Sequence, residues 1–347
     1  MTLVLSYSYQ DLDPADQTRF RALGALAYNQ PFDQLMLDAL WQLDDEGELE
    51  TACDTLRLLS LLELDYTYTG PDNESDQNSW YRLHLLLQTY ARALFHATEE
   101  AEGITSRYQQ YVVVTLTKKF WELPPEEWGR QITPYLPHIH GVGNILVQEW
   151  KNQTTTNTKV ATEAWLKMAQ LFAINTSPYL ALRREVHQQD WLELGLAVSQ
   201  SLQDQKQQAR FLNELGGVYS ALGEKAKALE YYNQALPIMQ AVGDRSSEAA
   251  ILNNMGLVYS ALGDKSQALD YYNQVLSILR AVGNRNVEAI TCYNIGMLYR
   301  NLGDLAQAVH YVALCVQLDQ EISHPDLESD IATLAALQKE LAVQKPT

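Results

Sequence analysis

The chain is poor in cysteine and has no long apolar run. Its 347 residues include three cysteines at wide spacings, Cys53, Cys292 and Cys315. An odd, scattered set excludes a disulfide framework and indicates reduced, buried thiols, which predicts a cytoplasmic protein. The longest strongly apolar runs, such as 111–114, are too short to span a bilayer. Residues 1–6 lack the basic start and cleavage site of a signal peptide, so we expect no membrane contact.

Positive charge is scarce, above all near the N-terminus. The formal net charge is −18, with 25 Lys and Arg against 43 Asp and Glu. Residues 1–104 alone hold 19 acidic and five basic side chains, a net charge of −14. Such a surface repels phosphate, so nucleic-acid binding by this segment is disfavoured.

The sequence also lacks the motifs of common catalytic and nucleotide-binding sites. It contains no Gly-x-x-x-x-Gly-Lys-Ser/Thr, no Gly-x-Ser-x-Gly and no glycine-rich dinucleotide loop. His138 and His140 could offer two metal ligands, but no nearby carboxylate or thiol completes a site. We therefore predict a protein that is not an enzyme and that holds no cofactor and no metal.

The C-terminal part of the sequence contains a repeat with a period of 40 residues. A five-residue segment with glycine second and tyrosine last occurs three times, as Leu215–Tyr219, Met255–Tyr259 and Ile295–Tyr299. Each copy is followed by a glycine turn and then by a second apolar run, at 228–232, 268–272 and 308–312. A fixed period of this length indicates stacked supersecondary units. Stacked units form an extended concave surface of the kind that binds other chains.

The spacing of small and aromatic residues in each copy resembles the tetratricopeptide repeat. The matching residues of the first copy are Gly216, Tyr219, Gly223, Ala228, Tyr232 and Ala235. The second copy departs at Val275 and the third at Val312 and Cys315. The usual repeat has about 34 residues. The 40-residue form resembles the longer variant of kinesin light chains and of many bacterial signalling proteins. This resemblance implies an α-solenoid in which the first helix of each unit lines a concave groove.

The same resemblance places a set of mostly polar residues in that groove, and implies a protein or peptide ligand. Carried over by position, the set is Asn213, Ser220, Asn253, Asn254, Ser260, Tyr293, Asn294, Met297 and Arg300. Asparagine amides can hold a peptide backbone through both a donor and an acceptor. The alternative is that these are solvated residues of a helix face that also bond within the array.

We expect the solenoid to span residues 187–345, with three full repeats and a half repeat at each end. Trp191 lies 40 residues before Tyr231, and Glu328 lies 40 residues after Glu288, so a helix over about 326–342 would close the array. Pro237 falls inside an expected helix and should kink or shorten it. Residues 105–186 look helical without a clear period and would form a connecting region, with a mobile loop at 151–159.

Residues 1–104 combine predicted helices with one hairpin. Helices are expected over 14–27, 32–41, 46–62 and 85–96. Asp13 would be the N-cap of the first, which has Pro14 in its first turn. Residues 63–68 and 80–84 would be two strands joined by a polar turn over 70–78.

This order of elements resembles the winged-helix domain of NB-ARC-type signalling ATPases, the STAND class. The likeness lies in residues 5–12, 20–26, 40–41, 58–62 and, most specifically, Tyr81–Ala91. In that family the histidine at the position of His84 reaches the phosphates of bound ADP. Here Leu85 stands where an acid usually follows, and no P-loop is present. The resemblance therefore implies an NTPase module in cis or in trans. The alternative is that His84 only caps a helix or packs at the strand–helix corner.

The sequence thus predicts a mostly α-helical protein with a winged-helix-like domain (1–104), a helical connecting region (105–186) and a tetratricopeptide α-solenoid (187–345). The predicted function is that of a non-enzymatic scaffold or sensor in a STAND-like signalling system. One alternative is the C-terminal part of an ADP- or ATP-binding STAND ATPase. Another is a winged-helix transcription regulator, against which the acidic charge of residues 1–104 argues.

Overall fold

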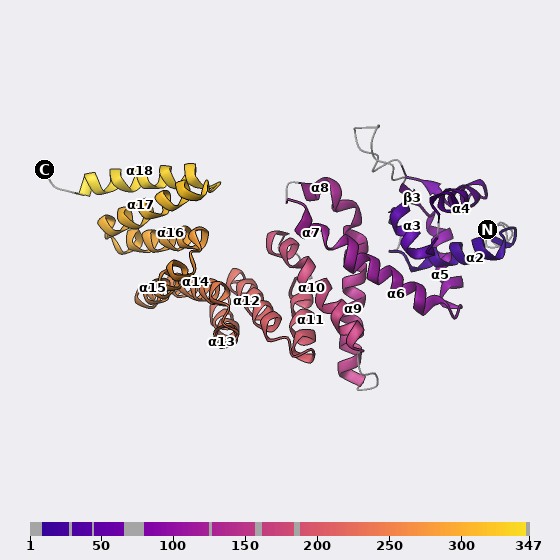
Figure 1. Ribbon diagram of the computed structural model, residues 1–347, viewed down its shortest axis with the longest axis horizontal. Coiled ribbons are helices and arrows are strands. Elements are labelled where there is room, and N and C mark those ends of the chain that lie inside the picture. The colour runs from indigo at the N-terminus through magenta and orange to yellow at the C-terminus, as the bar shows by residue number, and fades with distance from the viewer. Residues whose placement is uncertain are drawn as a thin grey trace. The chain divides into compact units, whose positions relative to one another are not determined.

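The computed structural model describes residues 9–27, 30–43, 45–65, 80–124, 127–156, 162–183 and 188–344. The chain divides into two compact units, residues 1–194 and 195–347, here called unit 1 and unit 2. The described residues are mostly helical, which confirms the predicted fold class (Figure 1). Among the described helices, none combines the length and the apolar character that crossing a membrane would need.

The N-terminal part of unit 1 combines four helices with a small antiparallel sheet. The helices are α2 (Pro14–Ala22, continued by the 3-10 turn η1, Leu23–Ala25), α3 (Gln34–Trp41), α4 (Glu46–Leu58) and α5 (Leu85–His96). The strands are β1 (Phe32–Asp33), β2 (Glu63–Leu64) and β3 (Trp80–Arg82), in the order β1-β3-β2. The predicted polar turn at 70–78 lies outside the described residues.

Local signals in this region gave the helix starts better than their ends. Asp13 is the N-cap of α2 as predicted, and its carboxylate accepts from the backbone N of Asp16 at 2.8 Å. The helix predicted from residue 46 begins there but ends at Leu58, because Ser60 adopts a left-handed conformation with φ of 58°. The helix predicted over 85–96 is confirmed.

Two residues predicted to open a helix instead form a strand. Phe32 pairs with Tyr81 and Asp33 with Trp80, so α3 begins only at Gln34. The Asp33 carboxylate caps this helix by accepting from the backbone N of Met36 at 2.9 Å. The apolar period of residues 32–41 contains no sign of this strand, because its partner lies almost 50 residues away.

The rest of unit 1 is helical. It comprises α6 (Ala101–Tyr111), a π-helical turn η3 (Val112–Leu116), α7 (Lys119–Glu122), α8 (Trp128–Gln131), η5 (Thr133–Tyr135), α9 (Leu136–Thr156), α10 (Glu163–Arg183) and the first part of α11 (Gln188–Ser201). The loop predicted at 151–159 is therefore wrong up to Thr156, and 157–161 lie outside the described residues. A Cβ added at Gly143 of α9 would lie 2.6 Å from Phe172 and 2.7 Å from Trp191, so α9 packs closely on α10 and α11.

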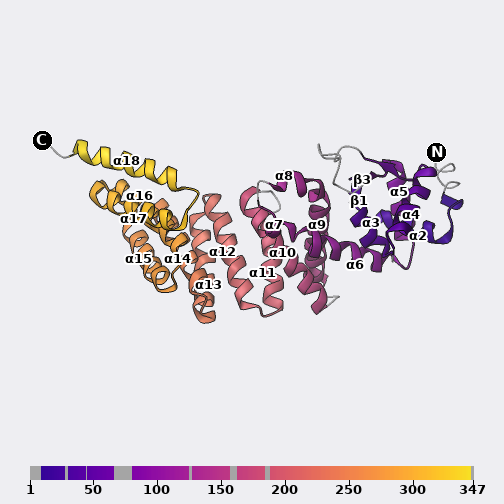
Figure 2. The ribbon, with the colours of Figure 1, turned by 45° about the horizontal axis from the view of Figure 1, so that its top comes forward.

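Unit 2 is a series of antiparallel helical hairpins (Figure 2). The first helices of the hairpins, here called A helices, are α12 (Gln205–Ala221), α14 (Arg245–Leu262) and α16 (Arg285–Leu302). The second, or B, helices are α13 (Lys225–Val242), α15 (Lys265–Val282) and α17 (Leu305–Ile322), and α18 (Leu327–Gln344) follows. Left-handed glycines such as Gly263 (φ 84°) end helices, and the next residue caps the following one: Asp264 accepts from the backbone N of Gln267.

Each hairpin is held by a glycine on the A helix facing a larger side chain on the B helix. A Cβ at Gly216 would lie 2.5 Å from Tyr232, and one at Gly296 would lie 2.6 Å from Val312. Both of these B-helix side chains are fully buried. The A and B helices can therefore approach this closely only because the A helix has no side chain at that point.

Two details of the array differ from the expectations. Pro237 was expected to kink or to shorten its helix, and it does not shorten α13, which runs to Val242 and has 18 residues, as α15 has. The turn before α18 (323–326) is two residues longer than the turn before α16 (283–284). The position of Glu288 is therefore taken by Asp330, and not by Glu328. Leu337, 42 residues after Ile295, correspondingly has the same complete burial as Ile295.

Candidate functional site

The predicted groove residues all lie on the A helices of unit 2, and asparagines join these helices to one another. The side-chain amide of Asn254 on α14 donates to Oδ1 of Asn213 on α12 at 3.0 Å. The amide of Asn294 on α16 donates to Oδ1 of Asn253 on α14 at 3.3 Å. These four residues form a ladder that crosses three successive A helices, and it is called the asparagine ladder below.

The asparagine ladder is half-buried and keeps unused hydrogen-bonding capacity. Asn253 is 8% exposed, while Asn213, Asn254 and Asn294 are of intermediate exposure. An asparagine side chain offers two donors and an acceptor oxygen with two lone pairs. Each member uses one of these within the ladder. These asparagines thus bond within the array and also keep donors and acceptors that the array does not use.

The other predicted groove residues differ in their surroundings. Ser220 lies at the end of α12, where its backbone oxygen and Oγ accept from Nζ of Lys225, at 2.7 and 3.2 Å. Arg300 forms an ion pair with Glu340 of α18, so its guanidinium is partly engaged within the array. Tyr293 packs against the core of the last hairpin, whereas Ser260 and Met297 are half-buried.

Two exposed apolar residues that were not predicted from the sequence lie beside the asparagine ladder. Leu257 on α14 is 45% exposed and Ile290 on α16 is 43% exposed. Leu257 lies three residues after Asn254, and Ile290 lies four residues before Asn294, so each neighbours a ladder asparagine on its helix surface. Comparison of the repeats by position could have found Leu257, because it corresponds to Gly217 and to the predicted Met297.

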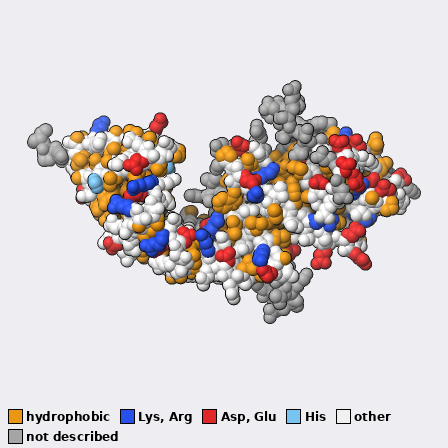
Figure 3. Space-filling model, viewed as in Figure 1, with side chains coloured by type: hydrophobic (Ala, Val, Ile, Leu, Met, Phe, Trp, Pro, Cys, Tyr) orange, Lys and Arg blue, Asp and Glu red, His pale blue; other side chains and the backbone are white. Residues whose placement is uncertain are grey.

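His84 lies in unit 1 and caps a helix. It is the N-cap residue of α5, and its Nδ1 accepts from the backbone N of Leu86 at 3.3 Å. His84 is exposed, and Leu85 and Leu86 beside it are each 44% exposed. Figure 3 shows acidic side chains gathered over the N-terminal part of unit 1.

The two histidines considered as metal ligands face different neighbours. Nε2 of His138 lies 2.8 Å from the carbonyl oxygen of Pro31, which can only accept, so Nε2 carries the proton. Its Nδ1 then accepts from the Tyr108 hydroxyl at 2.8 Å. Complete burial lowers the pKa of His138 to about 4. The ring of His140 instead packs edge-on against Trp191.

The thiols are poor nucleophiles. All three cysteines are free and buried. Burial raises the pKa of Cys53 and of Cys292 to about 11, so both stay protonated near neutral pH. A reactive cysteine needs the opposite shift, toward the thiolate.

Comparison with known families confirms the resemblance of the repeats. Residues 190–281 and 289–322 match sequence models of the tetratricopeptide repeat. This part of the chain is therefore built from tetratricopeptide repeats, a class of helical hairpin that generally binds proteins and is generally not catalytic. No curated protein matches the chain significantly. The winged-helix resemblance of residues 1–104 stays a prediction.

Several solved structures are similar to the chain. Aspartyl phosphate phosphatase F from Bacillus subtilis matches 90% of this chain and 76% of its own, with 11% identity and a TM-score of 0.54. The apo form of RapI matches 74% of this chain and 66% of its own, with 13% identity and a TM-score of 0.51. A STAND protein with a tetratricopeptide repeat sensor from Pyrococcus horikoshii matches 93% of this chain and 53% of its own, with 14% identity and a TM-score of 0.42. This chain thus spans about half of that protein. At 11% and 13% identity, the likeness to the first two structures concerns the fold alone.

Proposed function

We propose that the chain is a non-enzymatic scaffold or sensor that binds a protein or peptide segment across the A helices of unit 2. The observation that supports this best is the asparagine ladder with exposed apolar residues beside it. The unused donors and acceptors of Asn254 and Asn294 can bond to an extended backbone. Leu257 and Ile290 can bury an apolar side chain of the same ligand. The three free, buried cysteines support a reducing compartment such as the cytoplasm.

This proposal can be tested with a random peptide library displayed on phage and selected on the full chain. Selected peptides should lose binding to Leu257→Asp and to Asn254→Ala, because these changes place a charge in the apolar site and remove a ladder amide. Gln234→Asp is the matched control, since it adds the same charge at an exposed position of the B helix α13. Peptides that bind all three variants equally would show that the A-helix face is not the binding site.

We further propose that unit 1 contacts an NTPase module of a STAND-like signalling system, in cis or in trans. Support comes from the Tyr81–Ala91 segment and from the exposed pair Leu85 and Leu86 beside His84. An apolar pair at the N-terminus of α5 is suited to packing against another domain. His84 would then lie beside the phosphates of a nucleotide held by that module.

A nucleotide titration separates the two forms of this second proposal. Calorimetry with ADP on this chain alone should give no heat of binding, since the chain has no P-loop. When the chain is linked or mixed with such a module, His84→Ala should weaken ADP retention, and His96→Ala, at the other end of the same helix, should not. ADP binding by the chain alone would instead favour the alternative of an ATPase fragment that retains a site.

A further inference from the structure

At the three junctions before α14, α16 and α18, one equivalent position in the first turn of the helix is acidic. This junction acid is Glu248 on α14, Glu288 on α16 and, because of the longer turn, Asp330 on α18. The backbone N of each junction acid makes the same hydrogen bond, to the carbonyl oxygen four residues earlier. The N of Glu248 donates to the oxygen of Asp244, that of Glu288 to Asn284, and that of Asp330 to Asp326.

At the first two junctions the acid is buried and has cationic partners. Glu248 is 4% exposed and accepts from Arg245 at 2.5 Å and from Gln240 at 3.1 Å. Glu288 is also 4% exposed and accepts from Arg280 at 3.0 Å and from Arg285 at 2.8 Å. A buried carboxylate needs such partners, because leaving water without them is costly.

The third junction has no arginine at either position. The B-helix position held by Gln240 and Arg280 is taken by Gln320, and the position of Arg245 and Arg285 is taken by Leu327. The Asp330 carboxyl group instead lies beside a thiol and a second acid. At the two earlier junctions the acid therefore has arginine partners, whereas at this junction it has an acidic partner and a thiol.

The thiol and the second acid replace apolar core residues. Cys315 on α17 stands where the earlier B helices have Ala235 and Val275. Asp319, one turn later, stands where they have Met239 and Leu279. Both are 1% exposed.

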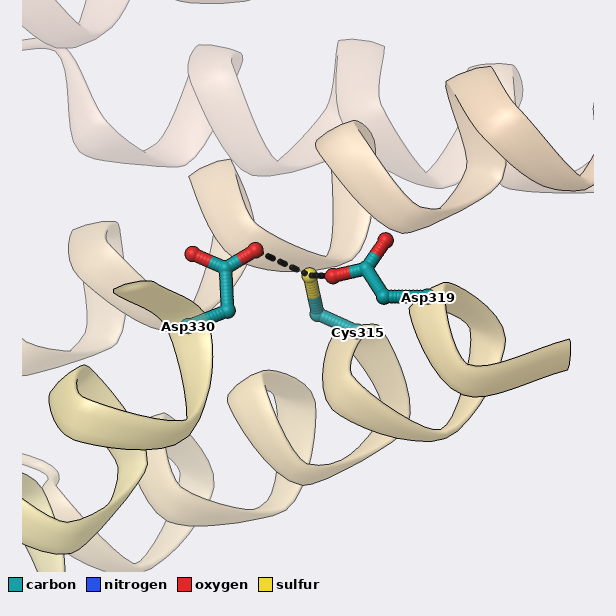
Figure 4. Close-up of side chains that lie close together, drawn as sticks. All are labelled: Cys315, Asp319 and Asp330. Atoms are coloured by element: carbon teal, nitrogen blue, oxygen red, sulfur yellow. Dashed lines mark hydrogen bonds between the residues drawn. The ribbon is translucent and has the colours of Figure 1, made fainter. Parts of the chain in front are cut away.

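The three side chains converge on one point (Figure 4). Sγ of Cys315 lies 3.3 Å from Oδ2 of Asp319 and 3.4 Å from Oδ2 of Asp330. One ligand atom from each residue lies within 4.8 Å of the other two. With Zn–S of about 2.3 Å and Zn–O of about 2.0 Å, two ligands of a tetrahedral zinc ion are roughly 3.5 Å apart. The observed S···O distances therefore fit two edges of such a tetrahedron.

We propose that Cys315, Asp319 and Asp330 bind a divalent cation of the Zn²⁺ class, which holds α18 on α17 in place of the arginines. A thiolate ligand favours zinc over magnesium and calcium, which prefer oxygen ligands only. Asp330 is half-buried and leaves this side of the site accessible to the ion and to a water as fourth ligand. Nδ1 of His324 lies 3.9 Å from Asp319 Oδ1 and accepts from the backbone N of Asp326, so His324 lies just outside the ligand set.

In the metal-free cluster the Cys315 thiol carries a proton and lies within hydrogen-bond distance of both carboxyl groups. Binding of Zn²⁺ would displace the thiol proton to solvent and form the Zn–S bond. Zinc affinity should therefore increase with pH.

The test uses the full chain, freed of metal with a chelator and titrated with ZnCl₂ against a competing dye. We expect one zinc equivalent that also raises the unfolding temperature, and a thiolate-to-metal charge-transfer band when Co²⁺ replaces zinc. Cys315→Ala and Asp319→Leu should abolish zinc binding, and with it the rise in unfolding temperature and the Co²⁺ charge-transfer band. These variants restore the residues found at the equivalent positions 235 and 279, so they are expected to fold, which circular dichroism can check.

The matched control is Cys292→Ala, which removes another buried cysteine of the same hairpin and should keep the zinc site. The proposal is overturned if zinc binding is equal in the wild type and in Cys315→Ala. It is also overturned if Co²⁺ gives no charge-transfer band, or if only Ca²⁺ binds, since neither outcome involves the thiolate.

Discussion

Gly256 on α14 lies directly against the ring of Tyr272 on α15: a Cβ at position 256 would be 2.6 Å from Cε1 of the tyrosine. Tyr272 is 1% exposed and cannot move into solvent without opening the hairpin. The close approach of the two helices therefore depends on the absence of a single methyl group.

Gly256→Ala should accordingly destabilise unit 2. Overpacking in a core costs about 1–3 kcal/mol, against a gain of up to about 1 kcal/mol for alanine over glycine in a helix. Far-UV circular dichroism during urea unfolding measures the change. All seven tryptophans lie in unit 1, so tryptophan fluorescence should report an unchanged unit 1 in the same sample. Gly217→Ala is the control, because its Cβ would meet only the Tyr232 hydroxyl at 3.9 Å. Equal stability of the two variants would contradict the packing argument.

Glu288→Gln should destabilise the junction between α15 and α16. The neutral amide is similar in shape but loses two charge-assisted bonds, from Arg280 and Arg285, worth about 1.5–3 kcal/mol at a buried carboxylate. Chemical denaturation provides the measurement. Asp54→Asn removes one side of an exposed pair with Arg57 and should change stability by less than about 0.5 kcal/mol. A similarly small effect at Glu288 would mean that the bonds from Arg280 and Arg285 contribute little to the stability of unit 2.

Unit 1 should lose stability in mild acid because of His138. Its pKa is about 4 in the fold against about 6.5 in the unfolded chain, so below pH 6.5 the unfolded chain binds a proton that the folded chain does not. The stabilising contribution is complete above pH 6.5 and is lost as the pH falls toward 4, by up to roughly 3 kcal/mol.

Tryptophan-detected urea unfolding at several pH values between 7 and 4 tests this. His138→Gln should be less stable at pH 7 but should show a flatter pH profile than the wild type. His310→Gln, an exposed change on α17, should leave the tryptophan-detected profile unaltered. If the wild type and His138→Gln have parallel profiles, the histidine is not the titrating group.

Pro237→Ser should stabilise unit 2. The exposed proline lacks a backbone donor inside α13, and the equivalent residue of α15 is Ser277. Restoring the donor in a helix interior is worth about 1–3 kcal/mol. The reverse change, Ser277→Pro, should cost a similar amount, and the two melting temperatures should shift in opposite directions. No shift for Pro237→Ser would indicate that α13 already compensates for the missing bond.

Much of unit 2 could be predicted from sequence because its signals are local and repeated. A left-handed glycine followed by a capping residue, as at Gly263 and Asp264, marks a helix boundary whatever the tertiary context. Three copies at one interval then identify the hairpins. Unit 1 was harder, since it has no period, and the strand at Phe32 depends on a partner at Tyr81.

The candidate groove was predictable only in part. The asparagines could be assigned to the A helices by position, but the bonds Asn254–Asn213 and Asn294–Asn253 connect residues 41 apart in neighbouring hairpins. The exposure of Leu257 depends on the same packing, because an apolar residue on a helix is normally assigned to the core.

The sequence by itself determined the repeat period and the hairpin boundaries of unit 2. Both follow from local backbone preferences that recur in three copies of the repeat. Only the tertiary structure decided which residues meet between hairpins. The two extra residues before α18 bring Asp330, and not Glu328, to the junction, where it faces Cys315 and Asp319. Such a meeting depends on how α18 packs onto α17, and no local preference specifies that packing.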